Sequence, residues 1–170
     1  ARLSHAYPTR ACRDTSDLFA FWYEATHSTT LRQLMAGIKT FSLPIRIYFE
    51  DTDSGGVVYH SNYLKFMERA RTEWLRTVGI DQRHLKQDNH IMFVVHRIDI
   101  QYKLPARFND NLIVKSELKD IGSSKIEFRQ MIYRNDEMLI DASVDVACID
   151  SEKFKPVRIP PTIKQAMESL

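Results

Sequence analysis

A short loop between a strand-like and a helix-like segment holds the residues best suited to chemistry. It comprises Asp51-Thr-Asp-Ser-Gly-Gly56 and is followed by Tyr59 and His60. A carboxylate such as Asp53 can attack an acyl carbonyl directly, or it can activate a water to do so. The first N–H groups of a helix are unpaired and stabilise developing negative charge. A helix beginning near His60 therefore predicts an oxyanion site beside a carboxylate, an arrangement suited to acyl transfer.

The same residues allow other interpretations. Asp51 and Asp53 also fit turn and N-cap positions, and their spacing does not exclude that role. A calcium loop is disfavoured because Gly55 stands where a ligand is needed and Asn62 where Glu is needed. An aspartate-dependent phosphatase is disfavoured because no later acidic pair and no doubly wound α/β pattern follow. His60 fits a capping or packing role as well as a catalytic one.

The remaining histidines and the cysteines predict no metal site. His96 falls on the apolar face of an alternating segment, which favours a core or interface histidine. Two cysteines alone cannot supply the four ligands of a structural zinc site. We expect no metal and no bound cofactor, and the sparse cysteines favour a reduced, cytoplasmic protein. The other histidines, which share no ligand spacing, are His5, His27, His84 and His90.

Two elements flank the loop and must position it. Before it, Ile45, Ile47 and Phe49 alternate with polar residues, which predicts a short strand. After it, apolar residues recur every three or four positions and predict one helix of about five turns, with Gly79 as its left-handed C-cap. The helical positions are Tyr63, Met67, Ala70, Trp74 and Val78. The charged pairs Arg69–Glu73 and Glu68–Arg71 are expected on the solvated outer face.

Four further alternating segments follow a polar connection at residues 81–89. Hairpin signals separate the later ones, at Gly122-Ser-Ser124 and Asn135-Asp136. No helix between them is long enough for a parallel crossover, so the pattern predicts an α+β fold: an antiparallel sheet of five to six strands wrapped around one long central helix. A homodimer with paired sheets would cover the strand that is apolar on both faces. The four segments are Met92–Leu104, Leu112–Leu118, Ile126–Ile132 and Met138–Cys148.

The composition is that of one folded globular domain. The chain has 170 residues, 44% hydrophobic and 27% charged, with 24 Lys and Arg against 22 Asp and Glu. The net charge of +2 gives no basic field for nucleic acid, and no apolar run approaches the roughly 18 residues of a membrane span. Residues 1–40 are expected to be an N-terminal extension, either partly helical or foreign to the natural domain. Residues 41–170 form the domain proper.

The segment from Arg46 to Tyr63 resembles the signature of the 4-hydroxybenzoyl-CoA thioesterase branch of the hotdog superfamily. The matching positions are Arg46-Ile47, Thr52-Asp53, Gly56-Val57-Val58, His60 and Tyr63. The following segment, Leu64–Trp74, is similar to the Tol–Pal-associated acyl-CoA thioesterase subfamily. The resemblance covers about residues 44–165. It agrees with the order of strands and helix predicted from the patterns alone.

The resemblance implies a hotdog domain that hydrolyses the thioester of acyl-coenzyme A. Asp53 would be nucleophile or general base, and His60 the second catalytic position, with its backbone N–H polarising the carbonyl. It also implies a homo-oligomer, a dimer of dimers, with an acyl carrier protein or envelope complex as a further candidate partner. The substrate-binding positions would be Gly56, Val57, Val58, Tyr59 and Tyr63.

One departure from the family keeps a second hypothesis open. Phe49 stands where close relatives carry a tyrosine that supports the site, so a hydrogen bond is lost there. The alternative function is a non-catalytic acyl-carrier or envelope-complex binding module on the same fold. Cations that could meet the phosphates of coenzyme A are Arg97, Lys103, Arg107, Lys119 and Lys125.

Overall fold

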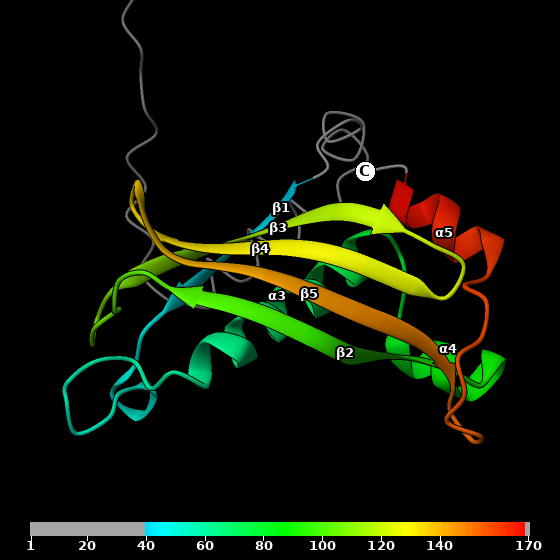
Figure 1. The fold of residues 1–170 in the computed structure, drawn as a ribbon, viewed down its shortest axis with the longest axis horizontal. Helices are drawn as coiled ribbons and strands as arrows, with labels where there is room; N and C mark the ends of the chain where they lie inside the picture. Colours follow the sequence, from blue (N-terminus) through cyan, green and yellow to red (C-terminus); the bar gives the residue numbers. More distant parts are fainter. Residues whose placement is uncertain (1–39, 169–170) are drawn as a thin grey trace, which may run out of the picture. The chain divides into compact units, whose positions relative to one another are not determined.

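The computed structural model describes residues 40–168, which form a five-stranded antiparallel sheet with three helices (Figure 1). The strand order is β1-β3-β4-β5-β2, so β1 and β2 are the two edges. The predicted α+β architecture is confirmed, with five strands. The partly helical N-terminal extension expected over residues 1–40 lies, apart from Thr40, outside the described residues. The elements are β1 Thr40–Arg46, α3 Asn62–Thr77, α4 Gln82–Asn89, β2 Ile91–Tyr102, β3 Asn111–Ile121, β4 Lys125–Arg134, β5 Glu137–Asp150 and α5 Pro161–Glu168.

Helix α3 runs along one face of the sheet and supplies the centre of the core (Figure 1). Its predicted apolar stripe is confirmed, because Met67, Ala70 and Trp74 are all buried. The Trp74 ring meets the Phe128 ring of β4 edge-on, with centroids 5.2 Å apart. Gly79 follows the helix with a φ of +80°, the left-handed conformation that glycine adopts without strain.

The first strand differs from its prediction at both ends. It begins at Thr40 and ends at Arg46, whereas the alternation predicted a strand through Phe49. Pro44 interrupts the strand pattern in the sequence, so the start could not be predicted. The proline is tolerated because β1 is an edge strand. The end is set by a turn, in which the backbone N–H of Tyr48 donates to Asp51 Oδ2 at 2.9 Å. Phe49 then opens a 3₁₀ turn and is 79% exposed.

A β-bulge interrupts β2, so the uninterrupted alternation predicted for this strand was wrong. Val95 pairs with a β5 residue and Arg97 with the next, so His96 is an extra residue between them. The bulge switches the inward positions: Phe93 lies on the core side before it and Ile98 after it. His96 is exposed. The core position expected for His96 was therefore wrong because it assumed an uninterrupted period of two, whereas the interface position stays a prediction.

The connection expected to be only polar contains helix α4. Asp81 caps it by accepting from the Arg83 backbone N–H at 2.7 Å, and His90 ends it in the left-handed conformation. Leu85 is the one buried residue of α4, so the sequence carries no apolar period there. Helix α5 is the last element of the described residues, and it buries Ile163 and Met167. Within residues 40–168, no helix is long and apolar enough to cross a membrane.

A buried polar network joins α3 to the sheet. Arg71, predicted on the solvated face, is only 9% exposed, and its Nη1 donates to Gln130 Oε1 at 2.6 Å. Gln130 Nε2 in turn donates to Met67 O at 3.0 Å and to Ser116 Oγ at 2.8 Å. Burial lowers the pKa of the Arg71 guanidinium, and Glu68 opposes this effect. Arg71 therefore points inward because Gln130 of β4, itself bonded to Ser116 of β3, offers it a polar partner.

Candidate active site

The Asp53 loop folds as a small hairpin between β1 and α3. Thr52 and Val58 form an antiparallel bridge, and the Asp53 backbone N–H donates to Val57 O at 2.9 Å. The N–H of Tyr59 donates to Asp51 O at 2.9 Å. These backbone bonds give the loop a defined shape, so its side chains have fixed points of attachment. Figure 1 places the loop at the end of α3 opposite to α4 and α5.

The turn of this hairpin orients the Asp53 side chain. Asp53 Oδ1 accepts from the Gly55 N–H at 2.8 Å, while the residue is exposed. A Cβ on Gly55 would lie 3.0 Å from that same oxygen, so a side chain there would crowd the carboxylate. Gly56 has a φ of +71°, which a glycine accommodates. The turn therefore brings the backbone close to the Asp53 carboxylate.

The start of α3 offers backbone donors close by in the chain. Helix α3 begins at Asn62, and its N-cap Ser61 makes no side-chain capping bond. Within the described part of the chain, the N–H groups of His60 and Ser61 donate to no acceptor. His60 is exposed and its ring lies against that of Tyr59, with centroids 4.4 Å apart. Unpaired N–H groups at a helix start are suited to bind an oxyanion.

Two residues that sequence reasoning did not select hold this helix start. Asn62 is buried, and its Nδ2 donates to Asp51 O at 2.9 Å. The Tyr102 hydroxyl of β2 donates to His60 O at 3.2 Å. Burial raises the pKa of Tyr102, so the hydroxyl keeps its proton for this bond. Asn62 lies inside the signature segment and could have been found there, but nothing in the sequence ties Tyr102 to residue 60.

Tyr63 holds the segment that packs against the Asp53 loop. It is 2% exposed, and its hydroxyl accepts from the Ala106 N–H at 2.9 Å. Ala106 O accepts in turn from the Val58 N–H at 2.8 Å. Burial raises the pKa of Tyr63, partly offset by the Ala106 bond. This chain of contacts fixes the 105–110 segment against the Asp53 hairpin.

The predicted substrate-binding residues differ in how far their side chains are buried. Gly56 and Tyr59 are exposed and Val57 is half-buried, whereas Val58 and Tyr63 are buried. The first three are accessible to a ligand, and the buried two shape the wall behind them. A direct contact of any of these residues with substrate stays a prediction. Phe49, beside them in sequence, packs edge-on against Phe108 with ring centroids 6.2 Å apart.

The five predicted phosphate-binding cations do not gather at the loop. Arg107 lies in the 105–110 segment that contacts it, and Lys103 follows Tyr102 directly. Lys119 pairs with Glu117 and Lys125 with Asp145, at 2.8 and 2.9 Å. Lys103 also has a carboxylate partner, Asp141, at 3.8 Å, and Arg97 is exposed beside the β2 bulge. Arg107 is thus the cation best placed beside the hairpin.

No group of three or more His, Cys, Asp or Glu residues within residues 40–168 is arranged to hold a metal ion.

Comparison with known proteins identifies the family. A model described as the thioesterase-like superfamily matches residues 47–167. The chain belongs to this superfamily. Its similarity to the acyl-CoA thioesterase YbgC of Haemophilus influenzae is 46% identity over 130 residues, covering 76% of this chain and 96% of that protein. The acyl-CoA thioester hydrolase YbgC of Escherichia coli O6:H1 is 40% identical over 124 residues, covering 72% and 92%.

The solved structures of the thioesterase-like superfamily agree with the observed fold. A crystal structure described as a probable thioesterase from Bartonella henselae superposes with a TM-score of 0.68 at 34% identity, covering 71% of this chain and 99% of that chain. The hotdog fold expected from the resemblance is therefore confirmed. The matched segment contains both the Asp53 hairpin and α3.

Proposed function

We propose that this chain hydrolyses acyl-CoA thioesters, with Asp53 as the reacting carboxylate. The observation that carries the proposal is the Asp53 side chain, exposed and oriented by the Gly55 N–H, on a hairpin that leads directly into unpaired N–H groups at the start of α3. The relatives at 46% and 40% identity, named as an acyl-CoA thioesterase and an acyl-CoA thioester hydrolase, support the substrate class.

His60 and Asp53 have separate roles in the proposed reaction. The thioester carbonyl oxygen accepts from the His60 backbone N–H, which makes the carbonyl carbon more electrophilic. Asp53 then adds to that carbon, expelling the coenzyme A thiolate and leaving an anhydride that water hydrolyses. Alternatively, Asp53 takes a proton from water while the oxygen of that water adds, and the thiolate leaves and is protonated. Both routes release a free acid and a thiol, and both regenerate the Asp53 carboxylate.

The test is thiol release from a panel of short, long and aromatic acyl-CoAs by wild type and Asp53→Asn. Asparagine keeps an oxygen that can accept from the Gly55 N–H, so the hairpin is retained while the carboxylate is lost. We expect turnover by wild type only. Asp88→Asn, on the exposed face of α4, is the matched control and should retain full activity. Full activity of Asp53→Asn would refute the role of Asp53, and a wild type inactive across the panel would favour the binding-module hypothesis.

His60→Ala separates the two contributions of this residue. Alanine keeps the backbone N–H but removes the ring that packs on Tyr59. If the backbone donor polarises the carbonyl, His60→Ala should lose far less activity than Asp53→Asn. An equal loss in the two variants would assign the essential role to the imidazole.

We also propose that a second copy of the chain pairs along β2. This strand of 12 residues is a sheet edge with β5 as its one neighbour, and Val95 is 46% exposed on it. An edge of this length with an apolar side chain is favourable for pairing with another strand. Light scattering should give the mass of a dimer or of a dimer of dimers. A monomeric mass at every concentration would contradict the pairing.

A further inference from the structure

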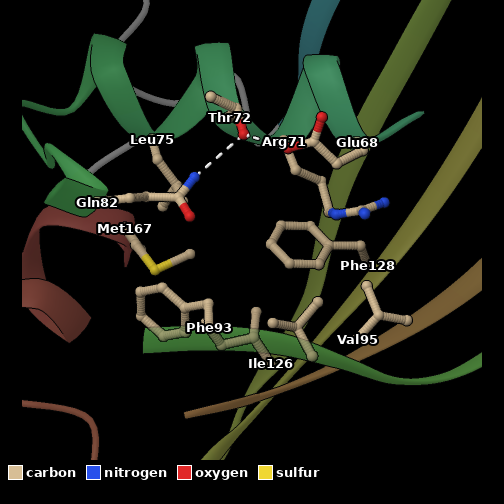
Figure 2. Close-up of a pocket in the computed structure, with 11 residues that line it drawn as sticks. Glu68, Arg71, Thr72, Leu75, Gln82, Phe93, Val95, Ile126, Phe128 and Met167 are labelled. Carbon is tan, nitrogen blue, oxygen red and sulfur yellow. Dashed lines mark hydrogen bonds between the residues drawn. The ribbon is translucent and has the colours of Figure 1, made fainter. Parts of the chain in front are cut away.

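A second site lies against α3, away from the Asp53 hairpin. A cavity of about 90 Å³ opens between α3, β2 and α5, and neither Asp53 nor His60 lines it (Figure 2). Its lining contains both polar and apolar side chains. Figure 2 shows polar side chains of α3 and α4 on one side and apolar side chains from the sheet and α5 on the other. The cavity is therefore amphipathic.

The polar side contains a buried cation without a matching anion. Arg71 is 9% exposed, and among the described residues the one hydrogen-bond partner of its guanidinium is the neutral side-chain amide oxygen of Gln130. Within residues 40–168, no carboxylate oxygen lies within 4.0 Å of it. A guanidinium has five N–H donors in a planar fork that matches a carboxylate. Buried charges in proteins are normally paired, so this cation is suited to an anion that residues 40–168 do not supply.

The acidic side chain that acts electrostatically on Arg71, Glu68, is itself hydrogen-bonded to another residue. Glu68, one turn before Arg71 on α3, accepts from Thr72 Oγ1 at 2.7 Å. Thr72 Oγ1 in turn accepts from Gln82 Nε2 at 3.1 Å, a bond drawn in Figure 2. This chain orders the polar side of the cavity and holds the Glu68 carboxylate toward Thr72. The Arg71 donors that do not contact Gln130 remain for a ligand.

The apolar side accepts a short hydrocarbon group. Phe93 and Phe128 line it together with Met167 of α5, and Val95 lies on the exposed side. A wholly apolar cavity of about 150 Å³ holds benzene, so a volume of about 90 Å³ that is apolar on one side suits a chain of a few carbon atoms. A ligand that satisfies both sides carries an anionic head and a small apolar tail.

We propose that this cavity binds a short aliphatic carboxylate, with the carboxylate on the Arg71 guanidinium and the alkyl group against Phe93 and Phe128. The acid released by thioester hydrolysis has this chemistry, so a product acid is the natural occupant; this last step rests on the proposed function, whereas the binding itself does not. Occupation would place an acid beside the central helix while the Asp53 hairpin remains open to substrate.

Trp74 provides a direct measurement of binding. Its ring contacts Phe128, which lines the cavity, so a ligand there should change its fluorescence. The chain has two tryptophans, and a Trp22→Phe background leaves Trp74 as the one reporter. The probes are butanoate, the uncharged isostere butyramide, and 1-butanol. We expect a saturable change with butanoate and at least a tenfold weaker response to the two uncharged probes, because a charge-assisted bond is lost.

Variants assign the binding to this cavity. Arg71→Gln should weaken butanoate binding at least tenfold, and Arg71→Lys should retain part of it because the charge remains without the planar fork. Arg76→Gln, an exposed arginine of the same helix, should bind as wild type does. Should Arg71→Gln fail to fold by circular dichroism, Val95→Phe gives a second test, since it narrows the cavity and should also weaken binding. Because Val95 also lies on the edge proposed to pair with a second copy, this variant is compared with wild type at equal oligomeric mass by light scattering.

Three results would overturn the proposal. Equal binding of butanoate and butyramide would show that the cation is not used. Loss of butanoate binding in Asp53→Asn would place the acid at the hairpin instead. Absence of saturable binding, together with a change of oligomeric mass in Arg71→Gln, would assign the missing anion to a second copy of the chain. Failure of the proposed hydrolysis alone would leave butanoate binding intact, so the two conclusions are tested separately.

Discussion

Replacing Gly55 by alanine tests whether the hairpin holds Asp53 in a reactive position. The new Cβ would lie 3.0 Å from Asp53 Oδ1, where ordinary contacts begin at 3.4 Å. The oxygen is also the acceptor of the Gly55 N–H, at 2.8 Å. The substitution therefore moves the carboxylate by a few tenths of an ångström and strains the bond that orients it.

The size of the effect follows from the sensitivity of catalysis to position. A misplacement of about 1 Å costs on the order of 100-fold, so a few tenths of an ångström should cost roughly fivefold to tenfold in kcat/KM. Stability should change little, because Gly55 does not require a positive φ. Alanine also restricts the unfolded chain, which contributes about 0.4–1 kcal/mol in the favourable direction.

Gly79→Ala is the matched control with the opposite expected result. Gly79 has a φ of +80° and its Cβ would meet nothing within 4 Å, so the cost is backbone strain alone. Strain of about 1 kcal/mol corresponds to a fall in Tm of roughly 4 °C, from an unfolding entropy of about 2.1 cal/mol/K per residue over about 130 residues. Its kcat/KM, measured well below Tm, should equal that of wild type.

The assay is thiol release at saturating and limiting acyl-CoA, with thermal unfolding followed by circular dichroism. We expect Gly55→Ala to lose activity at constant Tm and Gly79→Ala to lose Tm at constant activity. Full activity in Gly55→Ala would refute the argument that the hairpin fixes the position of Asp53. Parallel losses of activity and Tm in both variants would show that activity merely follows stability.

Two further predictions concern buried groups. Tyr63→Phe removes the acceptor of the buried Ala106 N–H and should destabilise the fold by about 1–3 kcal/mol. Tyr133→Phe loses only a weak contact to a methionine sulfur at 3.7 Å, so it should cost far less. Urea unfolding of both variants measures the two free energies. Burial raises the pKa of the Cys148 thiol from 9.0 to about 11, so its contribution is fully present below pH 9 and is lost as the pH rises through 11. The loss is up to about 3 kcal/mol. Cys148→Ala should reduce this alkaline loss, and an unchanged pH dependence would contradict it.

The elements with an uninterrupted period could be predicted from sequence, and those with a local exception could not. The apolar stripe of α3 and its glycine cap were sufficient to place that helix within a residue of its ends. In β2 the single extra residue His96 reversed the faces without changing the composition, because both sides of the strand are apolar near Val95. A bulge of this kind is set by the pairing with β5, which a single strand does not encode.

The site divides in the same way between local and distant contacts. The Asp53–Gly55 contact spans two residues, so it lies wholly inside the loop that the sequence indicated. The bond from Tyr102 to His60 spans 42 residues, and only the packing of β2 beside the helix start creates it. The sequence pattern therefore indicated the Asp53 carboxylate but not the Tyr102 side chain that holds the helix start.

The buried arginine shows a signal that was present in the sequence but assigned to the wrong surface. Arg71 lies three residues after Glu68, a spacing typical of solvated helix pairs. However, Ser116 and Gln130 occupy inward positions of two neighbouring strands that are otherwise apolar, and they are paired in the β3–β4 register. Two buried polar groups need polar partners, and the central helix is the element that faces them. Polar residues at matching inward positions of adjacent strands therefore indicate that one charged residue of the covering helix points into the core, and this criterion selects Arg71, whose guanidinium then donates to Gln130 at 2.6 Å.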